Sequence, residues 1–367
     1  MVAVTSRATR KAPYCNGVPP VPHLSATVVI PTRNRLPLLK ETVASVFAQR
    51  GVDWRVIVVD DASTDDTPAW LADLARDGVQ FIRCDEGVER SAARNLGLER
   101  VETPYVLFLD DDDVLQPGAL AALARGLHAR PEAFAAAGAR ALFDHARHIR
   151  RMPWPRWKVC RKAWPEILAG WIPVGGQTLL RTELVREVGG WKDGMIVAED
   201  QELWLRLAYT RPAVLVPGTV LRYRLHGLPR APWNTRIVER ELREQFVGGL
   251  PASDRLVGEQ AIVAWRTILE SNRAFFAHEH RRAIRLVMEV GRTAPWLLTS
   301  PITGPGLLAS LAKGLAAGAL PRPAGIVLEF AVDGTREVLG LSPRSRTPNP
   351  EKFDFYALPF EEAATEP

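Results

Sequence analysis

The sequence predicts an α/β fold: a mostly parallel sheet with helices on both faces, followed by a C-terminal all-helical region. From residue 27 to residue 113, short apolar runs alternate with segments of helical periodicity. This alternation is typical of a parallel sheet with crossover helices. Two of the apolar runs end directly in clustered aspartates, and beyond about residue 235 only the helical periodicity remains.

The first half of the chain supplies the parallel part of the predicted sheet. Residues 27–30 form a short β-branched strand that Pro31 ends, and residues 55–59 form a second strand. Residues 105–109 are apolar on both faces, which is typical of a buried parallel strand. A further strand is expected at 79–83, and helices are expected to begin near residues 36, 68 and 90.

The second half is less regular. In order, we expect a helix at 117–130, one or two strands within 134–150, a strand at 177–180, helices at 182–188 and 199–208, and edge strands at 214–216 and 221–224. The hydroxyl of Thr182 is expected to cap the helix that it begins. Four tryptophans, at 154, 157, 164 and 171, lie among prolines. They form either a satellite core or a platform for an apolar or sugar acceptor.

The composition is that of a soluble globular protein with a sizeable core. The 367 residues are 47% hydrophobic and 24% charged, and the net charge is +5. Arginines are in surplus between residues 222 and 292, as on a solvated face, and no basic block with interleaved aromatics indicates nucleic-acid binding. Cys15, Cys84 and Cys160 share no metal-type spacing, which favours a reducing compartment.

The sequence divides into a flexible leader at 1–25, an α/β domain at 26–232, a helical region at 233–341 and an extended tail at 342–367. The leader lacks the apolar core of a signal peptide, and no run of about 20 apolar residues predicts a membrane-spanning helix. We therefore expect a cytoplasmic protein. The proline-broken apolar stretch at 295–330 is interpreted as a buried helical layer, with a peripheral contact at the inner face of the membrane as the alternative.

Carboxylates follow two of the buried strands at the point where each strand ends. Asp60 and Asp61 follow the second strand, and aspartates 110–113 follow the fourth. Ligands of open α/β sheets bind outside the carboxyl ends of the strands. Clustered carboxylates repel one another unless a cation neutralises them, and Mg²⁺ or Mn²⁺ suits their oxygens. The alternative is a solvated acidic turn before the next helix.

Asp200 is a third acidic position of interest. It precedes Leu203 and Trp204 by three and four residues, so its carboxylate tops the apolar face of its helix. A plain helix cap is the alternative, because the helix dipole favours a carboxylate at this end.

Six motifs occur in one order along residues 25–230. They are Val-Val-Ile-Pro-Thr-Arg-Asn at 28–34, Val-Val-Asp-Asp-Ala-Ser-Thr-Asp at 58–65, Ala-Arg-Asn at 93–95, Phe-Leu-Asp-Asp-Asp-Asp at 108–113, Glu-Asp-Gln-Glu-Leu-Trp-Leu-Arg at 199–206 and Tyr-Arg-Leu-His at 223–226. In this order they resemble family 2 glycosyltransferases of the GT-A fold, which move a sugar from a nucleotide diphosphate to an acceptor.

The resemblance implies a role for each motif. It assigns the donor nucleotide to Pro31, Thr32, Arg33, Asp60, Asp61, Arg90, Asp110 and Asp111, with Asp61 and Asp60 at the N3–H of uracil. It places a divalent cofactor, Mn²⁺ or Mg²⁺, on Asp112 and His226, although a lone histidine after a strand is also common on plain surfaces. It makes Asp200 the general base, with inversion at the anomeric carbon, and brings Glu199 and Trp191 to the acceptor.

The chain departs from the processive members of this family. Their Gln-x-x-Arg-Trp motif is replaced by Glu-Leu-Trp-Leu-Arg at 202–206, and no membrane-spanning helices follow in the sequence. We therefore expect a single addition, from a UDP-sugar to a carbohydrate or glycoconjugate acceptor. The sequence names neither the sugar nor the oligomeric state.

Three other classes remain as alternatives. A haloacid-dehalogenase-type phosphatase also places Asp-x-Asp after a buried strand, but after the first strand rather than the fourth. A sugar-phosphate nucleotidyltransferase needs a glycine-rich loop after the first strand, where residues 31–34 contain no glycine. A nucleotide-sugar-binding scaffold without chemistry fits less well, because the carboxylates at 110–113 and 200 are all present.

Overall fold

The computed structural model describes residues 24–75, 79–143, 149–151, 158–171, 173–195, 198–225 and 235–299. The chain divides into two compact units, with boundaries after Ile167, Trp171 and Phe246. The first unit carries the sheet, and the second, which includes the short segment Leu168–Trp171, carries helices. The predicted leader up to residue 23, the predicted tail at 342–367 and His226 lie outside the described residues.

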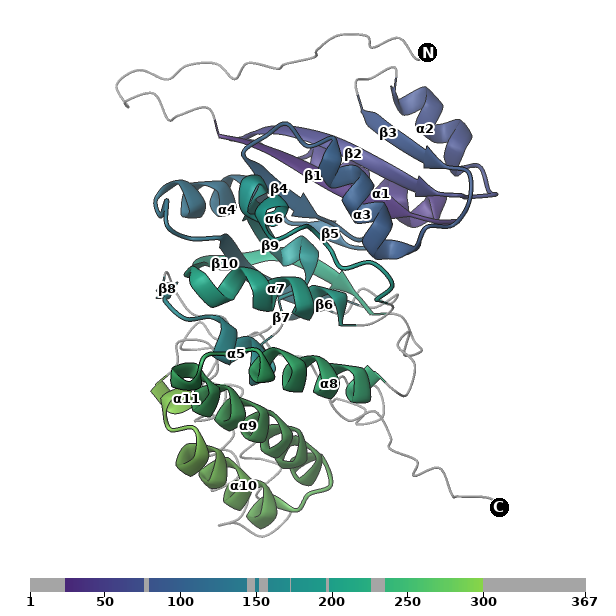
Figure 1. Ribbon diagram of the computed structural model, residues 1–367. Helices are drawn as coiled ribbons and strands as arrows, with labels where there is room; N and C mark the ends of the chain where they lie inside the picture. The colour runs from purple at the N-terminus through teal and green to yellow at the C-terminus, as the bar shows by residue number, and fades with distance from the viewer. Residues whose placement is uncertain are drawn as a thin grey trace. The chain divides into compact units, whose positions relative to one another are not determined.

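The strands of the described part form a single mixed sheet in the order β3-β2-β1-β4-β9-β6-β10-β5, with β7 beside β6 and β8 beside β10 (Figure 1). Their bounds are β1 Ser25–Thr32, β2 Asp53–Asp61, β3 Gln80–Cys84, β4 Tyr105–Phe108, β5 Val114–Leu115, β6 Ala135–Phe143, β7 Ile149–Arg151, β8 Lys158–Cys160, β9 Thr178–Arg181 and β10 Ala213–Arg224. The α/β fold class is therefore confirmed.

The predicted parallel half of the sheet is β3-β2-β1-β4. β1 pairs in parallel with both β2 and β4, and β2 pairs in parallel with β3. Thr32 lies opposite Asp60, and Val29 lies opposite Phe108, so these strands end at one edge. β9 then runs antiparallel to β4, which makes the sheet mixed beyond that point.

The prediction of two edge strands at 214–216 and 221–224 is wrong. Both segments belong to one strand, β10, which is flanked by β6 and β5 in the sheet. The pairing register of β10 shifts between Leu215 and Leu221. The intervening Pro217 and Gly218 interrupt the apolar pattern without ending the strand, because an irregularity absorbs them.

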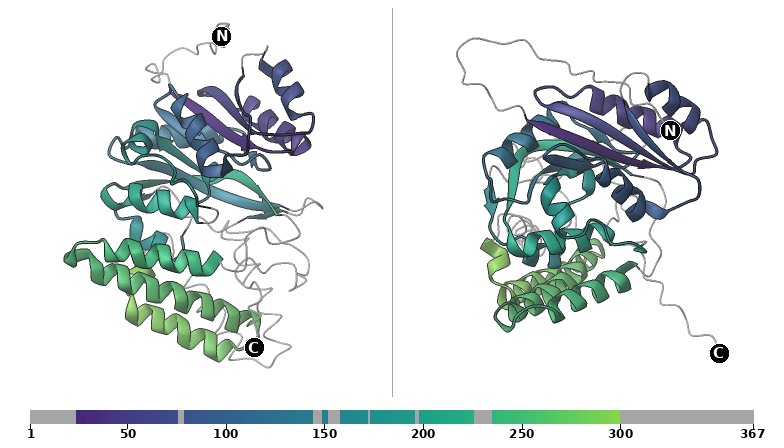
Figure 2. Two further views of the ribbon diagram at one scale, coloured as in Figure 1. Left: turned by 45° about the vertical axis from the view of Figure 1, so that its right-hand side comes forward. Right: turned by 45° about the horizontal axis from the view of Figure 1, so that its top comes forward.

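Helices cover both faces of the sheet (Figure 2). The helices from α1 to α8 are α1 Leu36–Phe47, α2 Thr67–Ala75, α3 Glu89–Glu99, α4 Ala119–His128, α5 Trp164–Leu168, α6 Thr182–Glu187, α7 Glu199–Thr210 and α8 Thr235–Gly248, with a 3₁₀ turn at Gly175–Gln177. Apolar side chains of α1, α2 and α4 join one core with alternate residues of the central strands. The other face meets α3, whose Gly97 lies against Val29 and Val59.

Thr182 does not cap the helix that it begins. The residue at the cap position of α6 is Arg181, and no side chain there bonds the first turn. The Thr182 hydroxyl donates instead to the carbonyl of Thr103 at 2.8 Å. This bond ties α6 to the segment that leads into β4, so a tertiary contact takes the hydroxyl that local capping would have used.

The second unit is helical, as the periodicity predicts. Its helices are α9 Ala252–Phe276, α10 His280–Thr293 and α11 Trp296–Thr299, and α9 and α10 pack side by side (Figure 2). Ala261, Ala264 and Trp265 of α9 are buried, as are Val287 and Val290 of α10. None of the helices in the described ranges is long and apolar enough to cross a membrane.

Gly97 tests the packing of α3 on the sheet. A Cβ atom at this position would lie 2.3 Å from Cγ1 of Val29. Gly97→Ala should therefore push α3 away from β1 and destabilise the protein by about 1–3 kcal/mol. The control is Gly248→Ala, because a Cβ on Gly248 meets nothing within 4 Å. Urea unfolding of both variants measures the difference, and equal stabilities would contradict this account of the packing.

Candidate functional site

The loops that follow β1, β2 and β4 meet at the carboxyl edge of the parallel strands. Asn34 joins the first two loops: its Oδ1 accepts hydrogen bonds from the backbone N–H of Thr64 at 2.7 Å and of Asp65 at 3.3 Å. The Asn34 backbone N–H donates to Oγ of Ser63 at 2.9 Å. These bonds hold the first two loops in one arrangement at the edge where ligands of such sheets bind.

Backbone strain is concentrated in the loops around this edge. Four non-glycine residues there have left-handed backbone conformations: Asn34 (φ 53°), Ala62 (φ 55°), Glu89 (φ 71°) and Ala198 (φ 60°). Each such residue costs of the order of 1 kcal/mol and persists only where its surroundings enforce it. Strain of this kind gathers at functional sites, and here it lies beside the clustered carboxylates.

Asp60 and Asp61 have different environments although both end β2. Asp60 is 0% exposed, and its oxygens accept hydrogen bonds from Arg83 Nη1 at 2.6 Å and from the Ser63 N–H at 3.0 Å. The prediction that Asp60 contacts the nucleotide does not fit this position, because Asp60 is buried and engaged within the loop. Asp61 accepts a hydrogen bond from the Val88 N–H through Oδ1 at 2.6 Å, and its Oδ2 lies 3.9 Å from Arg33 Nη1.

Asp111 holds the loop after β1 against the loop after β4. Its carboxylate accepts hydrogen bonds from the Thr32 hydroxyl at 2.8 Å and from Arg35 Nη1 at 3.1 Å. Arg35 also donates to Asp112 Oδ2 at 3.0 Å. Burial raises the pKa of Asp111 to about 6, although Arg35 and Thr32 act in the opposite direction. Asp111 and Thr32 are therefore buried residues that hold the two loops of the site together.

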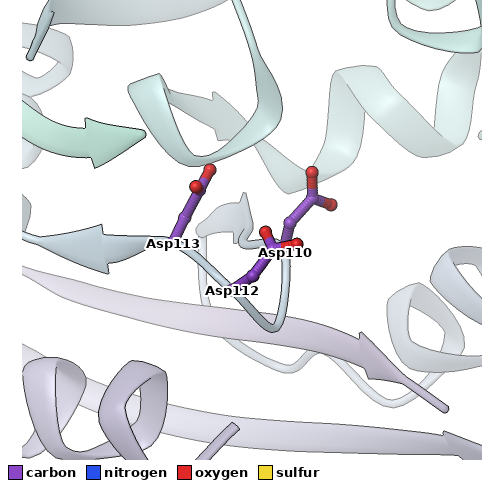
Figure 3. Close-up of side chains that lie close together, drawn as sticks. All are labelled: Asp110, Asp112 and Asp113. Carbon is purple, nitrogen blue, oxygen red and sulfur yellow. The ribbon is translucent and has the colours of Figure 1, made fainter. Parts of the chain in front are cut away.

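The other three aspartates of the cluster converge. Ligand oxygens of Asp110, Asp112 and Asp113 all lie within 4.8 Å of one another, on the turn between β4 and β5 (Figure 3). Asp113 is buried and accepts the backbone N–H of Arg224 at 2.9 Å. Burial, and then the charges of Asp110 and Asp112, raise the pKa of Asp113 well above its ordinary value.

This donor set fits a hard divalent cation. Mg²⁺ and Mn²⁺ take carboxylate oxygens, and three such oxygens are grouped at this turn. Burial is the main cause of the raised pKa of Asp113, and the charges of Asp110 and Asp112 raise it further, an effect that a bound cation would offset. Asp110, Asp112 and Asp113 are therefore the residues that could hold the ion. Asp113 was not among the predicted ligands, and His226, which was, lies outside the described residues.

Glu199 and Asp200 begin α7, in the position that its motif predicts. Glu199 Oε1 lies 3.2 Å from Arg94 Nη1 and 3.8 Å from Arg90 Nη1. The Oδ1 atom of Asp200 is buried, with no hydrogen-bond partner among the described residues. Burial, followed by the charges of Glu199 and Asp110, raises the pKa of Asp200 to about 7, although Arg94 and Arg90 oppose this effect. Such a carboxylate can take a proton near neutral pH.

Trp191 lies in the core and not at an open surface. Its ring is 2% exposed and packs edge-on against Phe108 and Trp204, with ring centroids 5.1 Å and 6.3 Å away. The guanidinium of Arg94 lies 4.3 Å from the ring centroid. The prediction that Trp191 contacts the acceptor does not fit this geometry, because its neighbours cover both the ring and its approach.

Two of the predicted donor residues offer exposed positive charge. The side chains of Arg33 and Arg90 are 57% and 60% exposed. A Cβ atom on Gly87 would lie 2.4 Å from Arg33 Nη1, so this loop passes close to the end of the Arg33 side chain. Pro31, by contrast, is buried within β1.

Arg35 and Arg94 belong to the site but were not predicted. Arg35 follows the first motif by one residue, and Arg94 is the central residue of Ala-Arg-Asn at 93–95. The sequence did contain an indication for Arg94. Its motif lies on a predicted helix, between the two predicted strands that end in aspartates. Its carboxylate partners, Asp110 and Glu199, come from distant parts of the chain, and only the fold identifies them.

Comparison with known proteins agrees with this geometry. Residues 27–189 match the model of the family "Glycosyl transferase family 2", a match that ends before Asp200. A GalNAc(5)-diNAcBac-PP-undecaprenol beta-1,3-glucosyltransferase of Campylobacter jejuni is 37% identical over 106 residues, 28% of this chain and 34% of that protein. The pre-mycofactocin glycosyltransferase of Mycobacterium tuberculosis is 29% identical over 303 residues, 81% of this chain and 57% of that protein. This chain thus spans less than two thirds of the length of either relative.

A solved structure supports the fold. Residues 1–349 of S. aureus TarS, crystallised in complex with UDP-GlcNAc, match with a TM-score of 0.55 and 15% identity, covering 89% of this chain and 95% of that one. This likeness concerns the fold alone and includes the part of the chain beyond residue 189. Residues 27–189 are thus similar to glycosyl transferase family 2, and the sheet with its surrounding helices has a GT-A-like fold.

Proposed function

We propose that this protein transfers a sugar from a nucleotide diphosphate, most simply a UDP-sugar, to an acceptor hydroxyl. The observation that carries the proposal is the position of Asp200. A carboxylate whose pKa is raised to about 7 begins a helix beside Asp110 of the clustered aspartates. The relatives named as glycosyltransferases and the UDP-GlcNAc complex of TarS support the same class of reaction.

The nucleotide is assigned to the loops after β1 and β2. Asp61 is proposed to accept the N3–H of uracil, since its partner Asp60 is buried and engaged. The exposed guanidinium groups of Arg33 and Arg90 are proposed to face the ribose and the diphosphate. Arginine forks suit phosphate oxygens because they bond them in pairs.

Asp200 is proposed as the general base. Its carboxylate accepts the proton of the acceptor hydroxyl as that oxygen forms a bond to the anomeric carbon. The bond from this carbon to the diphosphate breaks on the opposite face, so the configuration inverts and the nucleoside diphosphate leaves. A base positioned in this way contributes about 10²- to 10⁴-fold to the rate. Glu199 is proposed to orient the acceptor.

A divalent cation, Mn²⁺ or Mg²⁺, is proposed to bind Asp110, Asp112 and Asp113. When bound, such an ion neutralises charge that develops on a leaving diphosphate. The product is proposed to be a glycoconjugate or polysaccharide extended by one sugar, in keeping with relatives named as glycosyltransferases of such products.

Nucleotide binding provides the direct test of the donor site. Purified protein is melted with UDP, GDP, dTDP and ADP, each with Mn²⁺ and with chelator. A ligand that binds only the folded state raises the melting temperature by mass action. UDP should raise the melting temperature in the presence of Mn²⁺, and Asp112→Ala should lose most of the Mn²⁺-dependent part of that rise. No shift with any nucleotide would contradict the transferase proposal and favour a protein that does not bind nucleotide sugars.

The base assignment predicts a separation between binding and turnover. Asp200→Asn should lower the rate of UDP release from the preferred UDP-sugar by about 10²-fold or more, while the affinity for UDP stays nearly unchanged. In the wild type the rate should fall as the pH drops below about 7, because the base is then protonated. Glu202→Gln, on the same helix, is the control and should keep the wild-type pH profile. Normal turnover in Asp200→Asn would remove Asp200 from the reaction.

The ionised carboxylate of Asp200 should lower the free energy of unfolding at alkaline pH. Because folding raises the pKa of Asp200 to about 7, its contribution to stability is fully present below its unfolded pKa and is lost as the pH rises through 7. Asp200→Asn removes this loss and should stabilise the protein at pH 8 by roughly 1–4 kcal/mol, but not at pH 4. Urea unfolding in chelator measures the effect, with the exposed Asp66→Asn as control. A variant less stable than wild type at pH 8 would contradict it.

A further inference from the structure

Arg94 is an arginine in the interior of the site. It lies on α3, and its side chain is 3% exposed. A buried guanidinium loses several kcal/mol of hydration, which only well-placed partners offset. Its partners come from two other parts of the fold, so the position of Arg94 fixes those parts relative to each other.

The guanidinium bonds two carboxylates at once. Nη2 donates to Asp110 Oδ1 at 2.8 Å, and Nη1 donates to Glu199 Oε1 at 3.2 Å. Asp110 follows β4 and belongs to the clustered aspartates, whereas Glu199 is the first residue of α7. The side chain of Asp110 remains 41% exposed, so the bond to Arg94 leaves it open to the site. A planar guanidinium can bridge two carboxylates in this way, but an ammonium group is a single point charge.

Arg94 is itself held from a third side. The ring of Trp191 lies 4.3 Å from its guanidinium carbon. The next residue, Asn95, donates to the Trp191 carbonyl at 2.8 Å and accepts the Trp191 N–H at 2.9 Å. A Cβ on Gly190 would lie 2.6 Å from Asn95 Oδ1, so this close approach needs a glycine. Contacts of Trp191 and Asn95 therefore restrict the movement of Arg94.

The first turn of α7 depends on such a contact. Ala198, which precedes the helix, has a left-handed φ of 60° and no side-chain hydrogen bond to the first turn. Alanine in that conformation is disfavoured by roughly 1 kcal/mol or more. The bond from Arg94 to Glu199 is a tertiary contact that opposes this strain at the residue beside Asp200.

We propose that Arg94 is a positioning residue, which holds Glu199 and the first turn of α7 at a fixed separation from Asp110 and so directs Asp200 toward the acceptor hydroxyl. The proposal rests on the function proposed above. The bridge joins the donor side of the site to the base, and its positive charge also faces Asp200. The groups around Asp200 are Glu199 on its own helix, Arg94 and Arg90 on α3, and Asp110 after β4.

The competing explanation is that Arg94 forms a purely structural ion pair. Two substitutions distinguish this explanation from the positioning role. Arg94→Lys keeps the charge but cannot bridge both carboxylates, whereas Arg94→Met loses both charge and bridge. The control is Arg55→Met, because Arg55 is exposed and forms an ion pair with Glu102 away from the clustered aspartates. UDP release from the preferred UDP-sugar is measured with Mn²⁺ over a range of pH, together with the melting temperature of each variant.

The positioning role predicts a separation of kcat from KM. Arg94→Lys should lower kcat about 10- to 100-fold with KM for the UDP-sugar within about threefold, and leave the acid limb of the pH profile in place. Arg94→Met should lower kcat further and move the acid limb upward by about one pH unit, since a positive charge facing the base is gone. Wild-type kcat in Arg94→Lys, or an unmoved acid limb in Arg94→Met, would overturn the proposal.

A second measurement keeps the two proposals distinguishable. If the wild type releases no UDP from any donor, the proposed transferase function fails by itself. The bridge is then judged from melting temperatures of Arg94→Met, Glu199→Gln and the double variant in chelator. The bridge is supported if the decreases in melting temperature of the two single variants add up to more than the decrease in the double variant, by about 3 °C or more. Strictly additive losses overturn it.

Discussion

The concentration of negative charge at one edge of the sheet is the constraint on which the rest of the site depends. Parallel strands end at the same edge, so Asp61 at the end of β2 and the aspartates after β4 lie along that edge, where Asp110, Asp112 and Asp113 come close together. Carboxylates as close as these three repel one another, and the fold opposes the repulsion with arginines from other elements. Arg35, Arg83 and Arg94 each bond an aspartate of this edge. The arginines therefore offset part of this charge, and the fold divides the carboxylates between those that hold the loops and those that form the candidate metal site.

This division explains why neighbouring aspartates differ in role. Asp60 and Asp111 are buried, and their oxygens bond to Arg83 and Ser63 or to Arg35 and Thr32. They fix the loops, and their removal would leave buried donors without acceptors. Asp110 bonds Arg94 yet stays partly exposed, and Asp61 accepts the Val88 N–H through Oδ1. Aspartates that are adjacent in sequence, such as Asp60 and Asp61 or Asp110 and Asp111, can therefore have different roles at this edge.

The sequence predicted the elements whose periodicity is local, and it placed the acidic strand ends correctly. The alternation over residues 27–113 corresponds to β1 through β4 with their helices. What it could not predict depends on partners distant in the chain. Thr182 bonds Thr103 instead of capping α6, Trp191 packs on Phe108 instead of lining a surface, and β10 continues through Pro217 and Gly218 because β6 and β5 flank it. A motif identifies a residue type at a position, but burial decides its role, and burial is a property of the whole fold.

The balance of charges around Asp200 shows how such a fold sets the strength of a base. Burial and the charges of Glu199 and Asp110 favour the protonated form, and Arg94 and Arg90 favour the ionised form. The partial positive charge at the N-terminus of α7 also favours the ionised form of Asp200, as the arginines do. Burial and the acidic neighbours outweigh the arginines, so the pKa of Asp200 is raised to about 7, near the value at which a carboxylate is both ionised and basic enough to take a proton. Because α7 is a helix packed through Leu203 and Trp204, this balance is maintained by a rigid element rather than by a mobile loop.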